Sequence, residues 1–151
     1  MDTSGSPQQD EVDLVMAAWH RERPDLDLQP LAVLSRVSRM ARLLDLARRE
    51  AFGAGSLDPW EFDVLSALRR AGAPHELSPG ALVAQTLVTS GTMTNRIDRL
   101  VDRGHVERLP SRTDRRGVIV RLTESGRDAV DAAMEQLLTH ERELLAGVGE
   151  A

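Results

Sequence analysis

Hydroxyl, amide and guanidinium side chains are concentrated in one short stretch of the chain, residues 89–99. Hydroxyl and amide groups can hydrogen-bond to phosphates or base edges, asparagine can pair with adenine through two hydrogen bonds, and arginine can do the same with guanine. Asn95 is the only asparagine in the sequence. A single residue here could equally lie on a solvated helix surface or cap the backbone, but the group favours contact with DNA. The candidate DNA contacts in this stretch are Thr89, Ser90, Thr92, Met93, Thr94, Asn95, Arg96 and Arg99.

A second group of arginines lies in the polar stretch 110–117, where Arg112, Arg115 and Arg116 surround Asp114. A carboxylate that faces DNA is repelled by phosphate, so we expect Asp114 to hold one of these guanidinium groups in place and all four residues to belong to the DNA contact set. The alternative is an exposed hairpin tip in which this ion pair contributes almost nothing to stability.

The charge distribution supports a nucleic-acid partner. Residues 88–121 contain eight arginines and four carboxylates, a net charge of +4, whereas the rest of the chain carries −9 within a total of −5. A basic segment inside an acidic protein is typical of a nucleic-acid contact surface, although a solvated face would have the same composition. All 19 basic residues are arginines. Arginine suits two-pronged contacts to phosphate or guanine, but a coding bias would give the same count.

Several classes of protein are excluded by composition. The sequence has no cysteine, so disulfides, thiolate zinc sites and cysteine nucleophiles are ruled out. No apolar run approaches the ~20 residues of a membrane span, and the polar, acidic start is unlike a signal peptide, which predicts a cytoplasmic protein without a membrane partner. The four histidines lack metal spacing, and the sequence contains no phosphate-binding loop, dinucleotide motif or nucleophile elbow. We therefore expect no cofactor, no metal and no enzymatic activity.

The elements that must position these residues can be traced along the chain. Residues 1–9 are predicted to form a disordered tail, and apolar periodicity predicts helices over 10–23 and 30–52. Asp58, Pro59 and Glu61 form a helix start with a capping box, and Ser78 with the following proline starts a short helix to about 85. A further helix runs from 89 or 90 to 104, two short strands surround the basic loop, and the last helix begins after Thr123.

The order of these elements is helix, turn, helix and basic hairpin, which is the order of a winged helix-turn-helix. The second helix would enter the major groove of double-stranded DNA, and the hairpin would reach the neighbouring backbone or minor groove.

Residues 58–126 resemble the MarR family of transcriptional regulators. The resemblance is carried by TSGTMTNRIDRLVDRGHVERLPSRTDRRGVIVRLTESG at 89–126. It implies a mainly α fold with a small β-hairpin, in which a single domain over 10–151 has dimerisation helices at 10–54 and 123–148 and a winged helix-turn-helix at 56–122. It also implies a homodimeric repressor that binds a palindromic operator. The apolar stripes at 31–44 and 130–145 suit a dimer interface, and would equally suit a monomer core.

The segment WHRERPDLD at 19–27 has a narrower resemblance, to the urate-responsive, PecS/HucR-like branch of this family. That resemblance implies a pocket for a small anionic ligand, urate or a related purine or carboxylate, formed by Trp19, Asp63, Arg70, Arg96 and Arg108. Asp63 and Arg70 are ~10.5 Å apart along one helix face, so each needs a partner from elsewhere, and Arg96 could pair with Asp63.

Other interpretations of these residues stay open. Trp19 could be a core anchor, Asp63 and Arg70 could be solvated, and Arg96 could contact only phosphate. The alternative functions are a regulator of this family without a ligand response, and a winged-helix module that binds protein.

Overall fold

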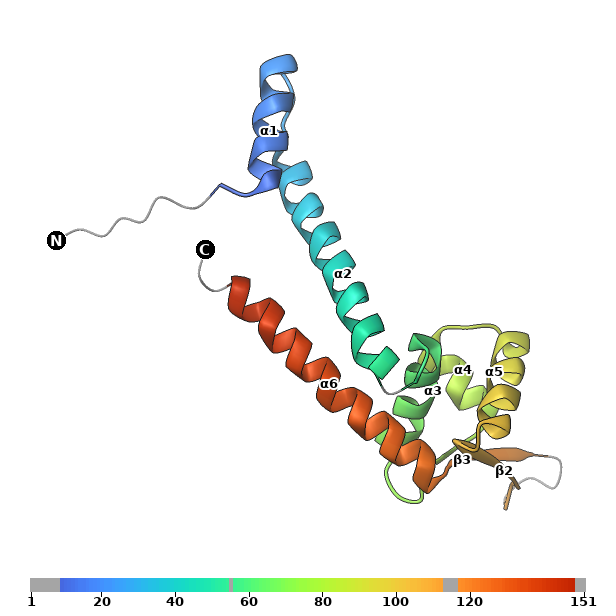
Figure 1. Cartoon of the computed structure of the whole chain (residues 1–151). Coiled ribbons are helices and arrows are strands. Elements are labelled where there is room, and N and C mark those ends of the chain that lie inside the picture. The colour runs from blue at the N-terminus through green and yellow to red at the C-terminus, as the bar shows by residue number, and fades with distance from the viewer. Residues whose placement is uncertain (1–8, 55, 113–116, 149–151) are drawn as a thin grey trace. The chain divides into compact units, whose positions relative to one another are not determined.

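The computed structural model describes residues 9–54, 56–112 and 117–148, which form two compact units. Among the described residues, the first unit contains 9–47 and 140–148, and the second contains those between 48 and 139. Two long helices, α2 (Gln29–Ala54) and α6 (Glu124–Val148), contribute residues to both units (Figure 1). The unit boundaries therefore fall inside helices and not in the connections between them.

In the first unit, α1 (Glu11–Glu22) is held against α2 by charge pairs. Asp10 caps α1, and its carboxylate accepts the backbone N–H of Asp13 at 2.9 Å. The guanidinium of Arg36 on α2 donates to Asp10 at 2.8 Å and to Asp13 at 2.6 Å. Arg36 lowers the pKa of Asp10 from its ordinary 3.8 to about 2. The sequence predicts this helix within one residue at each end, but its ion pairs join residues 23 and 26 positions apart.

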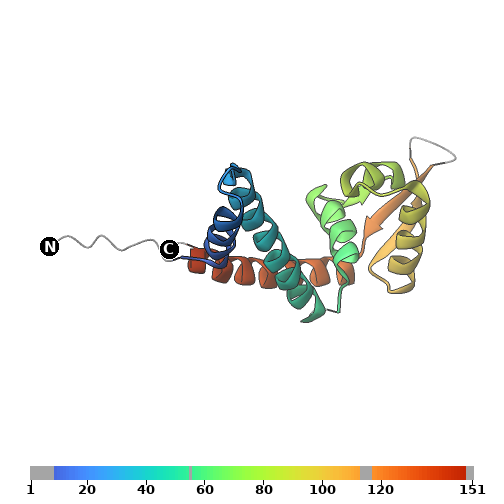
Figure 2. The same ribbon diagram turned by 90° about the horizontal axis from the view of Figure 1, so that it is seen from above.

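The second unit contains three short helices, α3 (Pro59–Arg70), α4 (Pro79–Thr86) and α5 (Ser90–Asp102). Each begins directly after a capping residue that the sequence predicts. Ser78 accepts the N–H of Ala81 at 3.2 Å, and Thr89 accepts the N–H of Thr92 at 3.3 Å. The helix α3 packs on α4, and α4 packs on α5. Figure 2 shows these helices and the strands gathered in one body.

The strands form a three-stranded antiparallel sheet in the order β1 (Glu76–Leu77), β3 (Val118–Leu122), β2 (Val106–Pro110). The sequence predicts only the hairpin of β2 and β3. The structure confirms this hairpin and adds β1, a third strand that is too short to produce an alternating pattern. Arg121 on the central strand lies opposite Glu76 on one side and Glu107 on the other, and its guanidinium pairs with both carboxylates.

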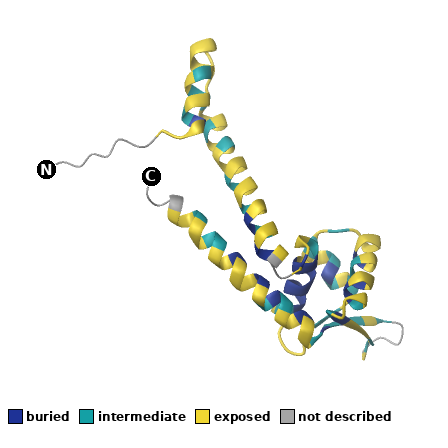
Figure 3. Cartoon of the chain, in the orientation of Figure 1, coloured by how far each residue is buried: buried dark blue, intermediate teal, exposed yellow. Residues whose placement is uncertain are grey.

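Residues from α2 to α6 and from the strands β2 and β3 form the apolar core of the second unit. Figure 3 shows the buried residues gathered at α3 and its neighbours. Phe52 at the end of α2 stacks on Phe62 of α3 with ring centroids 4.2 Å apart. The other large, fully buried side chains include Leu65, Leu68, Leu82, Met93, Ile97, Leu100, Val120 and Val130. These contacts confirm a mainly α fold with a small sheet.

The first turn of α6 packs directly on the turn that leads into β2. The Thr123 hydroxyl donates to the carbonyl of Gly104 at 2.7 Å and accepts the N–H of Gly126 at 3.0 Å. The Thr123 N–H donates to the His105 carbonyl at 3.1 Å. A Cβ atom on Gly126 would lie 2.0 Å from that same carbonyl oxygen. A side chain at position 126 therefore does not fit this junction.

Large apolar side chains are exposed on the helices of the first unit. Val33, Leu34 and Val37 on α2 are 60%, 64% and 58% exposed, and Leu145 on α6 is 66% exposed. Figure 3 shows exposed residues along most of α1 and α2. Across the described ranges, no helix is both long enough and apolar enough to span a membrane.

Candidate nucleic-acid interface

The helix α5 has a sharply divided surface. Met93, Ile97 and Leu100 are at most 1% exposed and join the core, because their spacing of three and four residues places them on one face. The residues in and just before α5 that the sequence nominates for DNA contact and that remain exposed are Thr89, Ser90, Thr92, Thr94, Asn95 and Arg99, whereas Arg96 is half-buried. Met93 requires a correction: the sequence grouped it with these residues, but burial makes it a core residue that cannot reach DNA.

The hydroxyl groups at the start of α5 already make local hydrogen bonds. The hydroxyl oxygens of Thr89 and Thr92 lie 2.9 Å apart, and the Thr94 hydroxyl donates to the Ser90 carbonyl at 3.1 Å. Each hydroxyl oxygen still has acceptor capacity. The side-chain amide of Asn95 makes no hydrogen bond to any residue that the structure describes, so both of its ends are available to a ligand.

The two arginines of this helix lie over a tryptophan from α3. The guanidinium carbon of Arg99 is 4.7 Å from the ring centroid of Trp60, and that of Arg96 is 5.5 Å from it. The indole N–H of Trp60 donates to the Asp58 carboxylate at 3.2 Å, and this carboxylate lies 3.8 Å from Arg99. Sequence reasoning missed Trp60. The available signal was a tryptophan two residues after the capping residue of α3.

The far end of α5 is tied to α3 by a buried carboxylate. Glu61 is 0% exposed; its Oε2 accepts the Asp58 N–H at 2.8 Å and pairs with Arg103. Arg103 also donates to the Ser56 carbonyl at 2.6 Å. Burial, and then the nearby Arg103 charge, lower the pKa of His105. The sequence predicts Glu61 as a capping residue, and its second role as the partner of Arg103 joins positions 42 residues apart.

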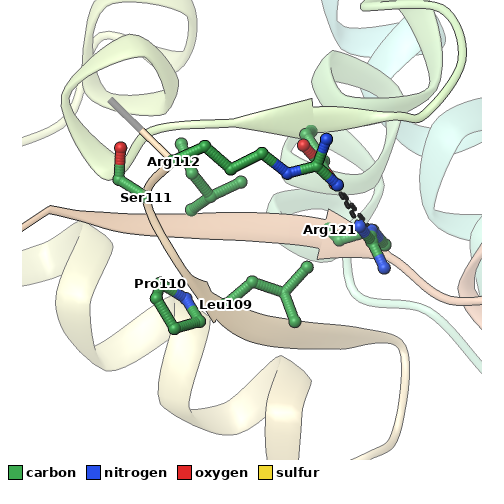
Figure 4. Close-up of a pocket in the computed structure, with 7 residues that line it drawn as sticks. Leu109, Pro110, Ser111, Arg112 and Arg121 are labelled. Atoms are coloured by element: carbon green, nitrogen blue, oxygen red, sulfur yellow. Dashed lines mark hydrogen bonds and ion pairs between the residues drawn. The ribbon is translucent and has the colours of Figure 1, made fainter. Parts of the chain in front are cut away.

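The wing is formed by β2, β3 and the loop between them. Arg108 of β2 pairs with Asp98 on α5, so this side of the wing is attached to α5. Arg112 is exposed at the end of the described part of the loop. A pocket on the strand side is lined by Glu76, Leu109, Pro110, Ser111, Arg112, Ile119 and Arg121 (Figure 4). The candidate contacts Asp114, Arg115 and Arg116 lie outside the described residues.

Four of the five residues expected in a ligand pocket have separate surroundings in the structure. Trp19 lies on α1 in the first unit and is 49% exposed. Arg70 is exposed at the end of α3 and makes no ion pair with any residue the structure describes. Arg96 contacts Trp60, and Arg108 contacts Asp98.

The remaining member, Asp63, pairs with a different arginine from the one the sequence suggested. Its carboxylate accepts from Arg48 at 2.9 Å, not from Arg96. Arg48 also lies over the stacked rings of Phe52 and Phe62, 5.5 Å and 5.9 Å from their centroids. These cation–π contacts favour the position of the guanidinium beside Asp63. Within the described ranges, no group of three or more acidic, histidine or cysteine residues could hold a metal ion.

Comparisons with known proteins agree with this arrangement. Residues 56–117 match the MarR family. The chain is 37% identical to the HTH-type transcriptional regulator PecS of Dickeya dadantii over 140 residues, which is 93% of this chain and 84% of that protein. These relatives are transcriptional regulators, in agreement with the prediction that the chain is not an enzyme.

Solved structures give the same result. Wild-type MarR from E. coli in its apo form has a TM-score of 0.66 and 30% identity, covering 76% of this chain and 83% of that chain. A cysteine-to-serine mutant of the same protein, complexed with operator DNA, has a TM-score of 0.64 and 29% identity, covering 78% and 83%. The winged helix built above and these matches assign the chain to the MarR family of DNA-binding transcriptional regulators and, within it, to the PecS-like branch.

Proposed function

We propose that the chain is a homodimeric repressor that binds a palindromic operator, with α5 in the major groove and the wing against the adjacent backbone. The observation that carries this proposal is the exposed, polar half of α5, where Asn95 and Arg99 lie opposite the buried face. The similarity of this chain to a solved structure of MarR complexed with operator DNA supports DNA binding. A module that binds protein would expose an apolar or acidic helix surface here.

The dimer is supported by the apolar side chains of the first unit. Val33, Leu34 and Val37 form an exposed group on α2 that a second copy would cover. Analytical ultracentrifugation should give twice the chain mass of 16.6 kDa. We expect Val37→Asp to shift this equilibrium toward monomer and to weaken operator binding, because each subunit would then contact its half-site alone. A wild-type monomer that binds the operator at full affinity would contradict the proposal.

Operator binding is tested by fluorescence anisotropy with a DNA site selected from a random pool. Arg99→Gln should weaken binding to this site by about tenfold or more. Arg115→Ala and Arg116→Ala should weaken specific and non-specific binding alike and lower the slope of log K against log salt by about 1 per lost phosphate contact. Arg21→Gln is the matched control, because it removes one exposed arginine from α1. An unchanged slope in the two wing variants would mean that the wing does not contact the backbone.

We also propose that a small anionic ligand, urate or a related purine or carboxylate, releases the operator. Arg70 and Arg108 offer guanidinium groups to such an anion, and neither is buried. Near Asp63, the bound negative charge would repel that carboxylate and disturb its pairing with Arg48, 2.9 Å away. Because Asp63 and Trp60 share α3, the disturbance would be passed to the arginines of α5.

The ligand proposal is tested by titrating urate, xanthine and citrate separately into the protein–operator complex at constant ionic strength. We expect release by one of them at up to millimolar concentration, and loss of that release in Arg108→Ala and Trp19→Leu when each is compared with its own starting affinity. If none of the three releases the operator, the chain is a regulator without this response. Retained release in both variants would place the ligand elsewhere.

A further inference from the structure

We propose that Trp60 is a positioning residue that sets Arg96 and Arg99 for DNA contact. The proposal rests on the DNA contact proposed above for the exposed, polar half of α5. It adds a residue on α3 that acts on DNA through these two guanidinium groups.

The Trp60 ring is held in a fixed orientation. It lies in the first turn of α3, half-buried against the core, and its N–H donates to the Asp58 carboxylate at 3.2 Å. Asp58 in turn is fixed by the 2.8 Å hydrogen bond from its backbone N–H to the buried Glu61. The orientation of the ring is therefore set by its contacts with Asp58 and the core, independently of the two arginines.

Two arginines from successive turns of α5 converge on this ring. Arg99 lies 4.7 Å and Arg96 5.5 Å from the centroid, and Arg99 is also drawn toward Asp58 at 3.8 Å. A guanidinium group beside an aromatic ring is attracted by the ring's π electrons. When it stacks, its N–H groups, which lie in the guanidinium plane, remain available to phosphate or guanine. Contact with the ring and contact with DNA are therefore compatible.

Holding an arginine in place favours binding because a long, mobile side chain loses rotamer freedom when it is immobilised at an interface. In this protein, contact with Trp60 already restricts the two arginine side chains in the absence of DNA. The guanidinium groups border an open hollow that Trp60 shares with Gly91, Thr92 and Asn95 of the same exposed face. The ring and the two arginines therefore line the same hollow as residues of the exposed face of α5.

A purely structural role for Trp60 makes a different prediction. A residue that only packs lowers the stability of the protein when it is replaced, and its effect on DNA binding is then independent of the arginines. A positioning residue is coupled to them, so that removing an arginine costs less once the ring has gone.

The experiment is a double-mutant cycle measured as operator affinity, using Trp60→Leu, Arg99→Gln and the double variant, with a parallel cycle for Arg96→Gln. We expect Trp60→Leu to weaken operator binding about tenfold per subunit, from about threefold for each cation–π contact. In the Trp60→Leu background, Arg99→Gln should cost at least threefold less than in wild type. Trp60→Phe keeps a smaller aromatic face and loses the hydrogen bond to Asp58, so it should bind the operator more tightly than Trp60→Leu and recover most of the affinity.

Two further readouts separate the possible failures. Thermal melting of each variant reports stability, and the salt slope reports phosphate contacts, which a packing defect alone does not change. If Arg96→Gln and Arg99→Gln leave the operator affinity and the salt slope at their wild-type values, the exposed half of α5 does not contact DNA. The role proposed for Trp60 is then refuted as well. If the arginine variants weaken binding but their effects multiply independently with Trp60→Leu, or if Trp60→Phe fails to recover affinity, only the role of Trp60 is overturned.

Discussion

Replacing Gly126 by alanine tests the junction between the wing and α6. Inside a helix this change normally stabilises by up to about 1 kcal/mol, because alanine restricts the unfolded chain and glycine does not. Here the added methyl group would lie 2.0 Å from the His105 carbonyl oxygen, about 1.4 Å closer than the 3.4 Å at which such contacts become ordinary. The sign of the effect should therefore be reversed.

The size of the destabilisation depends on how far the His105 carbonyl group can move away from the added methyl group. The obstacle is backbone, and its carbonyl oxygen accepts the N–H of Thr123 at 3.1 Å, so it cannot retreat without weakening that bond. Forcing a methyl group into packed structure costs about 1–3 kcal/mol, and a weakened hydrogen bond adds about 1 kcal/mol. After subtracting the helix gain, we expect Gly126→Ala to lower the free energy of unfolding by about 2 kcal/mol. For a chain of this length that corresponds to a melting temperature about 4–8 °C lower.

The assay is thermal unfolding followed by circular dichroism at a fixed protein concentration, since an oligomer melts at a concentration-dependent temperature. Gly80→Ala is the matched control. Gly80 also lies in the first turn of a helix, and the nearest atom to its added methyl group is a serine hydroxyl at 3.9 Å. The control should be as stable as wild type or slightly more stable. A Gly126→Ala protein that melts at or above the wild-type temperature would refute the close approach of α6 to the turn before β2.

Three other predictions concern charged groups. Arg103→Met leaves the buried Glu61 carboxylate without its cation and should lower the free energy of unfolding by about 3 kcal/mol, whereas the double variant Glu61→Met/Arg103→Met should recover most of it, as urea unfolding will report. The lowered pKa of His105 means that the unfolded chain binds a proton more readily, so stability should fall as the pH drops below about 6.5, and His105→Gln should reduce this loss between pH 7.5 and 5.5. Arg36→Gln should raise the pKa of Asp10 from about 2 toward 3.8, measured by NMR titration. In wild type the stability from this pair should be present above pH ~4 and be lost as the pH falls through 2.

Each of these has a result that contradicts it. Equal stability of Arg103→Met and the exposed control Arg21→Met would show that Glu61 does not depend on its pair. A pH dependence that is the same in His105→Gln as in the control His20→Gln would remove the assigned role of His105. An Asp10 pKa unchanged by Arg36→Gln would mean that the capping contacts of α1 alone set it.

The local parts of the fold were predictable because their signals are local. The capping residues Asp58, Ser78 and Thr89 each start a helix, as the sequence indicates. The residues that organise the site were harder to find, because their partners are distant in sequence. Neither the pairing of Glu61 with Arg103 nor the contact of Trp60 with α5 leaves a periodic pattern. Residue type alone also did not show which residues of α5 are buried. Met93, which the sequence grouped with the DNA contacts, lies in the core.

The proposed ligand response does not require the direct pairing of Asp63 with Arg96 that the sequence suggested. Asp63 lies three residues after Trp60, a rise of ~4.5 Å along one rigid helix. A displacement of α3 that accompanies a change in the Asp63–Arg48 pair therefore also moves the ring beneath the arginines of α5. A ligand needs only a few kcal/mol of preference for one of two states to shift operator occupancy strongly, and small changes at packed elements are sufficient for that. We infer that the proposed route from ligand to DNA passes through the start of α3, where Asp58 and Trp60 contact Arg99 of α5 and Glu61 pairs with Arg103, the residue that follows α5.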